Sequence, residues 1–345
     1  MKKSFKQKYL IIIALVIFFS PIIGVILGNS IIPCWQFFNH LHTVFGLDSQ
    51  KDFFTFWIAL FGAIGIAINI YHNQKRIRLQ EKQLQKQDEQ LQKQQKHIDV
   101  LSKTQQDGRF AKGVELLGNA SESARTGAAY NLFFLAKEFP EEYSKSVFEI
   151  LCSHIRTNTN DKEYQDKYKT SPSNEIQTIV DLLFRNYEDE QYPFLGYEAI
   201  LRNSFLAGCD LGSTYLKGAY LTKANLENAN LRQADLEGAH FKKAYLWEVN
   251  LERANLWETH LEGASLWKAH LEGADLRRAD LSEANLEEAD LSYAYLEDAN
   301  LEGTNLKGVD LDKARNLDKA LNVDETSLPE GIIWHPAPNT DISDT

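Results

Sequence analysis

Cysteine is scarce in this sequence. Its three residues, Cys34, Cys152 and Cys209, lie far apart and form no CxxC pair. This spacing excludes a disulfide framework and a cysteine-based zinc site. The simplest interpretation is a reducing compartment for most of the chain.

Motifs that carry chemistry are also missing. The sequence has no GxSxG elbow, no P-loop, no HExxH helix and no glycine-rich dinucleotide turn, so the usual nucleophile, phosphate and zinc sites are not indicated. We therefore predict a protein that is not an enzyme, with no catalytic residues, no cofactor and no resident metal.

Charge is unevenly distributed along the chain. Residues 1–108 carry 13 lysines and arginines against 7 carboxylates, whereas residues 204–316 carry 12 against 20. A basic front suits an anionic membrane surface. An acidic back argues against nucleic acid as a partner, because nucleic-acid binding needs a positive footprint.

Two apolar stretches near the start predict two transmembrane helices, at about 9–31 and 53–71. Lysines precede the first stretch, and Lys75, Arg76 and Arg78 follow the second. The positive-inside rule then places both termini in the cytoplasm. A cleaved signal peptide is the alternative for the first stretch, and it leaves the orientation unchanged. We expect a membrane-embedded protein with a two-span hairpin over 1–71.

A seven-residue spacing follows at 72–107 and predicts a helical stalk. Apolar residues recur along one seam, at Ile77, Leu84, Leu91 and Ile98, while glutamines occupy most of the second seam. This pattern is typical of a coiled coil and predicts a homo-oligomer. A single solvated helix is the alternative. Gly108 is expected to end the stalk.

Residues 108–200 predict a small α-helical module. Amphipathic segments surround Pro140, residues 157–170 are polar and are expected to form a loop, and another helix should start near Pro172. Either a pair of HEAT-like hairpins or a plain capping bundle for the next segment fits this pattern.

The back of the chain repeats every five residues. A leucine register runs unbroken from Leu206 to Leu311, with Phe241 as its single exception. A small residue stands two places before each leucine, and Asn or Asp often stands one place before. A period of five fits neither a helix nor a strand. The pattern A-[DN]-L-x-x over more than a hundred residues resembles the pentapeptide-repeat family.

The resemblance implies a right-handed quadrilateral β-helix with four pentapeptides to a turn. Physically, five residues make one side and one corner, so coils of 20 residues would stack their leucines inward. The predicted fold class is such a β-helix over 201–316, preceded by the α-helical module and two transmembrane helices. Residues 317–345 are expected to form a C-terminal cap and tail, with 329–336 covering the last coil.

A second resemblance lies upstream of the repeat. The stretches RFAKGVELLG (109–118) and RTGAAYNLFFLAKEFPEE (125–142) look like the helical region that precedes the repeats in many bacterial membrane proteins of this family. It implies a bacterial inner-membrane setting and no defined activity.

Residues 20 apart should share one column on the rod. Trp247 and Trp267 are so spaced, Tyr245 flanks them, and Trp257 falls on the opposite side. We predict that Tyr245, Trp247 and Trp267 form a partner-binding face, because exposed tryptophan and tyrosine are typical of interfaces. His240, His260 and Asp280 form another column, for which a solvated ladder is favoured over a metal site.

Three functions remain open. The first is a membrane-anchored cytoplasmic scaffold or protein-interaction module built on the rod, with a cytoplasmic protein partner. The second is a membrane effector in defence or host interaction, with the rod as sensor and the spans acting as a pore or a perturbing element. The third is a DNA-mimic inhibitor of a topoisomerase, since the resemblance includes family members that look like an acidic DNA duplex and bind DNA gyrase or another topoisomerase.

Overall fold

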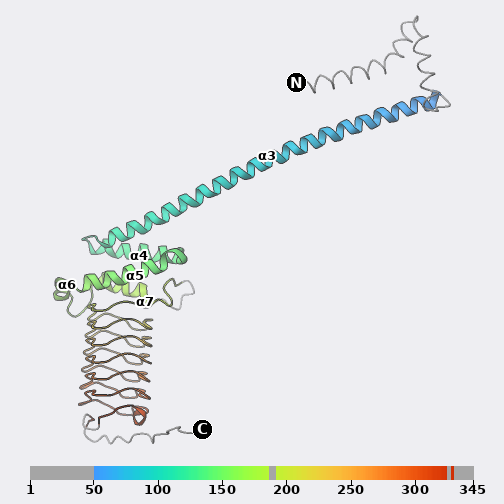
Figure 1. Ribbon diagram of the computed structural model, residues 1–345. Helices are drawn as coiled ribbons and strands as arrows, with labels where there is room; N and C mark the ends of the chain where they lie inside the picture. Colours follow the sequence, from blue (N-terminus) through green and yellow to red (C-terminus); the bar gives the residue numbers. More distant parts are fainter. Residues whose placement is uncertain (1–49, 186–191, 325–327, 330–345) are drawn as a thin grey trace, which may run out of the picture. The chain divides into compact units, whose positions relative to one another are not determined.

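The computed structural model describes residues 50–185, 192–324 and 328–329. The chain divides into two compact units, Met1–Ile98 and Asp99–Thr345. Figure 1 shows the helices α3 to α7 in chain order, followed by the stacked coils of the repeat.

Helix α3 spans Gln50–Leu117. No proline stands between Pro33 and Pro140, and the stretch is rich in glutamine, lysine and leucine, which favour helix. The helix does not end at Gly108 as expected, because one glycine costs only about 1 kcal/mol in a helix interior. The side chains of the predicted seam, Ile77, Leu84, Leu91 and Ile98, are each more than half exposed.

The prediction of two transmembrane helices is wrong for the described chain. No helix among residues 50–185 and 192–324 has an apolar stretch long enough to cross a bilayer. The first predicted span, 9–31, lies outside the described residues. The two-span hairpin, the membrane-embedded state and the inner-membrane location with cytoplasmic termini are withdrawn.

The helical module consists of α4 (Glu122–Glu138), α5 (Pro140–Thr159), α6 (Lys162–Lys167) and α7 (Asn174–Phe184). Pro140 occupies the first position of α5, where its missing N–H costs nothing. The polar stretch 157–170, expected to be a loop, contains the last residues of α5 and the short helix α6. The end of α3 packs on α4, and Gly113 makes this possible because a Cβ there would lie 2.7 Å from Leu132 Cδ2.

The repeat forms the expected coil of 20 residues. Parallel bridges join residues 20 apart, from Ile200↔Tyr220 to Tyr295↔Arg315, and the last bridge joins Asn300 to Leu321. The leucines point inward, and those from Leu206 to Leu306 are at most 2% exposed. The small residues two places earlier are also buried, among them Thr259, whose hydroxyl donates to the carbonyl of Leu236 at 3.1 Å.

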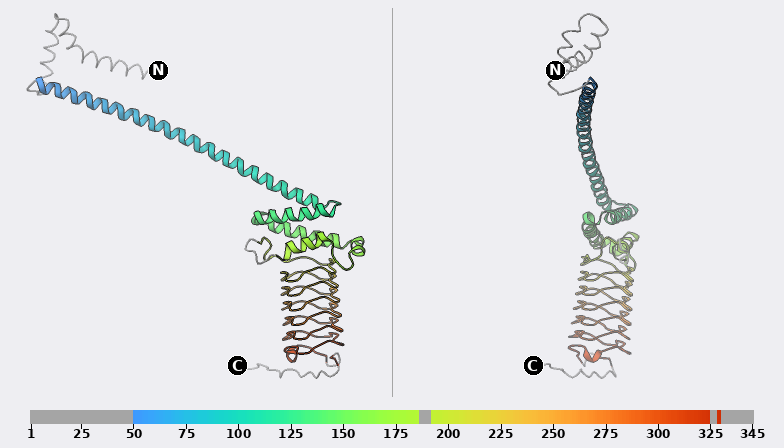
Figure 2. Two further views of the ribbon diagram at one scale, coloured as in Figure 1. Left: turned by 180° about the vertical axis from the view of Figure 1, so that it is seen from behind. Right: turned by 90° about the vertical axis from the view of Figure 1, so that its right-hand side faces the viewer.

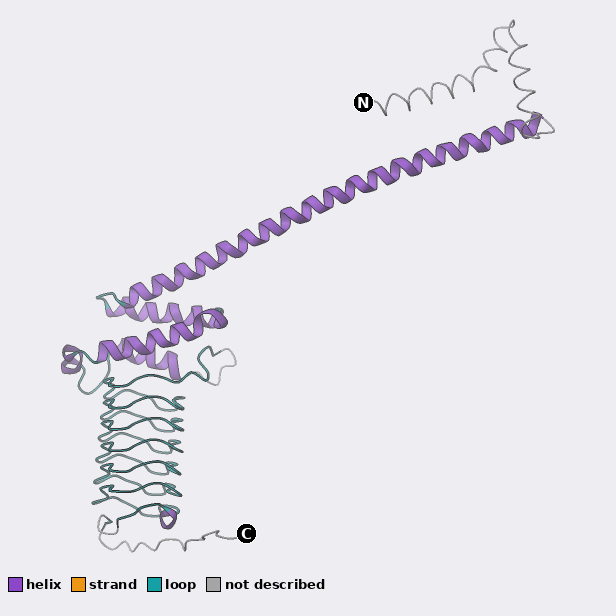
Figure 3. Ribbon diagram, viewed as in Figure 1, coloured by secondary structure: helices purple, strands orange, loops and turns teal. Residues whose placement is uncertain are grey.

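One pentapeptide shows why the sequence pattern gives this shape. Ala224 N–H donates to Leu221 O at 2.9 Å and closes a β-turn, whose third residue, Lys223, has φ +58°. The side chain of Asn225 then accepts the N–H of Glu227 at 2.9 Å, the local bond that favours Asn and Asp at turns. Each side of the coil is therefore a single bridged residue between turns. Figure 3 accordingly draws the coils as loops and turns.

The helices cover the first coil. Figures 1 and 2 show α7 and α5 lying at this end of the stack. Phe205 N–H donates to Thr159 Oγ1 at 3.0 Å, and Tyr215 N–H donates to Phe184 O at 2.9 Å. No coil precedes the first one, so these backbone N–H groups take their acceptors from the helices instead. At the other end a 3-10 helix, Leu317–Lys319, follows Asn316. Most of the predicted cover, from residue 330 onward, lies outside the described residues.

Candidate interaction surface

The coil geometry turns two of the three predicted contact residues fully outward. Tyr245 precedes an inward leucine and Trp247 follows it, and their side chains are 50% and 40% exposed. Their rings meet edge to face, with centroids 6.2 Å apart. The indole N–H of Trp247 donates to the hydroxyl of Ser265, one coil on. These contacts fix the direction of the rings and leave much of their area in water.

Trp267 lies in the next coil and is more covered than expected. The Nζ of Lys268 lies 4.4 Å from the centroid of its ring, a cation–π contact. The same ammonium lies 3.5 Å from the carboxylate of Glu288. Trp267 is consequently only partly exposed, so Trp247 and Tyr245 supply most of the exposed aromatic surface.

The opposite side of the rod carries Trp257, as expected from its half-coil offset. The guanidinium of Arg278 lies 5.7 Å from its ring centroid and donates to Glu258 at 3.2 Å. Tyr293, on a third column, accepts a hydrogen bond from Lys313 at 2.9 Å. Each of these aromatic side chains is therefore partnered by a cation of its own chain.

A recess of about 500 Å³ opens beside the tryptophan column. Its lining is mostly polar and comprises Asn228, Glu248, Lys268, Ala269, His270, Glu272, Glu288 and Asp290. Partial burial, with Asp290 nearby, raises the pKa of Glu272. The sequence-based predictions do not include this recess. The spacing of 20 between Glu248, Lys268 and Glu288 is the signal that places these three residues in one column.

The histidine column forms a stack. The rings of Tyr220, His240 and His260 lie parallel, with successive centroids 4.6 Å apart. Partial burial, followed by repulsion from His260, lowers the pKa of His240. Stacking presents ring faces to each other. Within the described ranges no group of three potential metal ligands is found.

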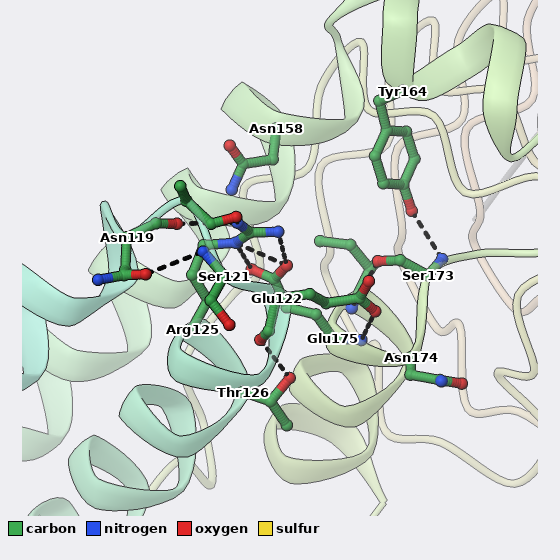
Figure 4. A network of polar contacts seen from close by, with 12 residues as sticks. Asn119, Ser121, Glu122, Arg125, Thr126, Asn158, Tyr164, Ser173, Asn174 and Glu175 are labelled. Carbon is green, nitrogen blue, oxygen red and sulfur yellow. Dashed lines mark hydrogen bonds and ion pairs between the residues drawn. The ribbon is translucent and has the colours of Figure 1, made fainter.

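A buried polar network ties the helical module together (Figure 4). The carboxylate of Glu175 on α7 accepts hydrogen bonds from Arg125 on α4 and lies 2.5 Å from His154 Nε2 on α5. The Arg125 guanidinium also donates to the carbonyls of Asn119 and Ala120. Every charged member has a partner, so the network holds helices together and presents no free group to a ligand.

The described cysteines are not arranged for reaction. Both Cys152 and Cys209 are buried. Burial raises the pKa of Cys152 to about 12 and also raises that of Cys209. A thiolate is the reactive form of cysteine, so neither side chain is poised as a nucleophile.

The repeat matches the family model for pentapeptide repeats, in eight copies over residues 199–238, 219–257, 239–278, 255–292 and 279–315. No curated protein matches this sequence. The family match carries neither a bacterial origin nor a membrane anchor.

Several solved structures resemble the repeat. Rfr23, a pentapeptide repeat protein from the cyanobacterium Cyanothece 51142, is 48% identical over 27% of this chain and 60% of its own, with a TM-score of 0.18. HetL, from Nostoc sp. strain PCC 7120 and involved in heterocyst differentiation regulation, is 38% identical over 36% of this chain and 65% of its own, with a TM-score of 0.15.

Full-length QnrB1, a plasmid-mediated fluoroquinolone resistance protein, is 23% identical over 33% of this chain and 78% of its own, with a TM-score of 0.12. The chain thus spans less than two thirds of the length of Rfr23 and of HetL. The family match covers the repeat itself, residues 199–315, which is about a third of the chain.

Proposed function

We propose that this protein is a non-catalytic scaffold whose pentapeptide-repeat rod binds a partner protein. The observation that carries the proposal is the exposed edge-to-face pair of Tyr245 and Trp247. The rod is held together by its inward leucines and by backbone bonds between coils. Its outward side chains are therefore available for recognition.

Within the described chain, Tyr245 and Trp247 lack the cation partner that several other aromatic side chains of the rod have. Trp257 and Tyr293 are each partnered by a cation of the chain, whereas Tyr245 and Trp247 contact chiefly each other and Ser265. Large aromatic side chains left in water gain free energy when a partner covers them, and tryptophan and tyrosine are enriched among residues that dominate binding. With Trp267 they form what we call the aromatic face: Tyr245, Trp247 and Trp267.

A photo-crosslinking amino acid at position 245 tests the proposal in cells that make the protein. We expect one discrete adduct, absent when the crosslinker replaces the equally exposed Tyr293. The Trp247→Ala/Trp267→Ala double variant should abolish the adduct without changing the melting temperature, and Trp257→Ala should leave it intact. An adduct of equal yield in all variants would show that the aromatic face is not the contact.

We also propose that α3 pairs with a second copy of the chain. The seam of Ile77, Leu84, Leu91 and Ile98 leaves four apolar side chains in water at a seven-residue spacing. A parallel in-register pair would bury them against each other. It would also bring Arg76 of one helix near Glu81 of the other, since such pairs flank a coiled-coil seam. The resulting scaffold would present two rods.

The other functions considered from the sequence are weaker. A membrane effector needs spans that the described chain does not have. A DNA mimic needs a continuous acidic surface, but the rod carries Lys242, Lys243, Arg277 and Arg278 on its outside. Ion pairs such as Arg278–Glu258 at 3.2 Å interrupt it further. The net negative charge of the rod is equally compatible with binding a basic segment of a protein, so it does not favour a DNA mimic.

A further inference from the structure

Two neighbouring tryptophans of the aromatic face differ in one respect. Trp267 carries a cation over its ring, because Lys268 follows it and folds back at 4.4 Å. Glu288 neutralises that ammonium from the next coil. The chain thus supplies a complete arrangement at Trp267, consisting of an aromatic ring, a cation and a carboxylate.

One coil earlier no cation follows the ring. Glu248 stands where Lys268 stands beside Trp267, and Glu227 lies one coil before Trp247 in the tryptophan column. Among residues 50–185 and 192–324, no cation lies over Trp247, and neither Glu227 nor Glu248 makes an ion pair. Trp247 thus lies beside Glu248 and Glu227, while the next cation of the column, Lys268, is already held over Trp267 and beside Glu288.

The adjoining recess has the same sign of charge. Its lining has four carboxylates, Glu248, Glu272, Glu288 and Asp290, against Lys268 and His270. Lys268 borders both the recess and Trp267, so the two features are continuous. Glu248, the residue that follows Trp247, also lines this acidic depression of about 500 Å³.

We propose that the aromatic face binds a basic segment of a partner protein, with an arginine or lysine side chain over Trp247 and its charge beside Glu227 and Glu248. This inference rests on the proposed function and gives the partner its chemistry. Tryptophan is the best aromatic receptor for a cation, and guanidinium stacks on such rings while pairing with carboxylate. Further cations of the same segment would enter the recess, where complementary charge favours association.

The test uses the purified full chain and two synthetic peptides of equal length, one with several arginines and one with glutamine at the same positions. Binding is followed by the indole N–H resonance of Trp247, assigned with a Trp247→Phe variant. We expect the arginine peptide to bind about tenfold more tightly, as expected for a cation over a tryptophan beside carboxylates. Added salt should weaken the binding.

The decisive variant is Glu248→Lys, which places the chain's own cation beside Trp247 as Lys268 lies beside Trp267. It should reduce binding of the arginine peptide at least as much as Glu248→Gln does. Glu258→Lys is the control on the opposite side of the rod, where Glu258 follows Trp257 and pairs with Arg278. Its melting temperature is compared with that of Glu248→Lys, because it also removes this ion pair. It changes the net charge equally and should leave binding within twofold of wild type, or about 0.4 kcal/mol.

The outcomes separate this inference from the proposed function. Equal binding of both peptides, or equal effects of Glu248→Lys and Glu258→Lys, would overturn the basic partner. The proposal that the aromatic face contacts a partner would then hold only if the crosslink from position 245 still depended on Trp247 and Trp267. Loss of that dependence as well would overturn both.

Discussion

The carboxylate of Glu175 lies 2.6 Å from Nη2 of Arg125, and only 2% of the Glu175 side chain is exposed. Burial alone would raise the pKa of this carboxyl, but hydrogen bonds from His154 and Arg125 hold it below its usual value. The pair joins α7 to α4, and His154 adds α5. A buried charge therefore fixes the helices that cover the first coil.

Glu175→Gln should destabilise the helical module by about 3 kcal/mol, because it leaves the guanidinium of Arg125 without its counter-ion. Glu163→Gln, an exposed change on α6, should cost less than about 0.5 kcal/mol. Chemical denaturation of both variants checks this. Equal midpoints would show that the buried pair contributes nothing.

The same pair predicts a pH dependence. Because the folded pKa of Glu175 is lowered, its contribution is complete above the unfolded value of about 4.3 and is lost as the pH falls through the folded pKa. Unfolding curves between neutral and acid pH should show the difference between wild type and Glu175→Gln shrinking below about pH 4. A stability difference that stays constant with pH would contradict the lowered pKa of Glu175.

The leucine register predicts a sharp contrast between two residues only two positions apart. Leu256 is 0% exposed in the middle of the rod, so Leu256→Ala should cost about 2–5 kcal/mol. Leu256→Asp should cost more, since an unpaired charge would enter the column. Glu258 has 46% of its side chain exposed, and Glu258→Ala should stay within about 0.5 kcal/mol. Thermal unfolding of the three variants checks which residues point inward. Equal effects at Leu256 and Glu258 would show that the inward positions are assigned wrongly.

The coil could be predicted because a leucine recurs at every fifth position of the repeat. Each inward leucine needs a small residue two places earlier, and the structure buries both. The Asn and Asp before the leucine had no explanation from periodicity alone. They accept N–H groups in the turns, and some also link coils, as Asn230 does by donating to Asp210 at 2.8 Å.

The surface was harder to predict than the core. Column arithmetic correctly placed Tyr245, Trp247 and Trp267 on one side, but it could not show that Lys268 folds over Trp267. Long side chains such as lysine choose among several contacts, and the sequence does not fix that choice. The length of α3 does not follow from Gly108 alone, because the strong helix formers on either side of this glycine outweigh its cost.

Two glycines of α3 should respond in opposite ways to alanine. A Cβ at Gly108 would meet no atom within 4 Å, so Gly108→Ala should stabilise the helix by up to about 1 kcal/mol. A Cβ at Gly113 would lie 2.7 Å from Leu132 Cδ2, so Gly113→Ala should force α3 away from α4 and cost about 1–3 kcal/mol. Melting temperatures should move in opposite directions, and a rise for both would mean that α3 and α4 do not pack as described.

The seam of α3 gives the last prediction. Leu84 is 61% exposed and lies in the middle of the seam, so two parallel helices in register would bring both copies of this residue together. In purified protein with Cys34 replaced by serine, Leu84→Cys should form a covalent dimer under mild oxidation. Lys82→Cys is the matched control, because position 82 lies on the outer side of such a pair and its sulfurs would stay too far apart to join. Dimer from position 84 alone supports pairing along the seam. Equal yields from both positions would reflect random collision, and no dimer from either would make α3 a monomeric spacer.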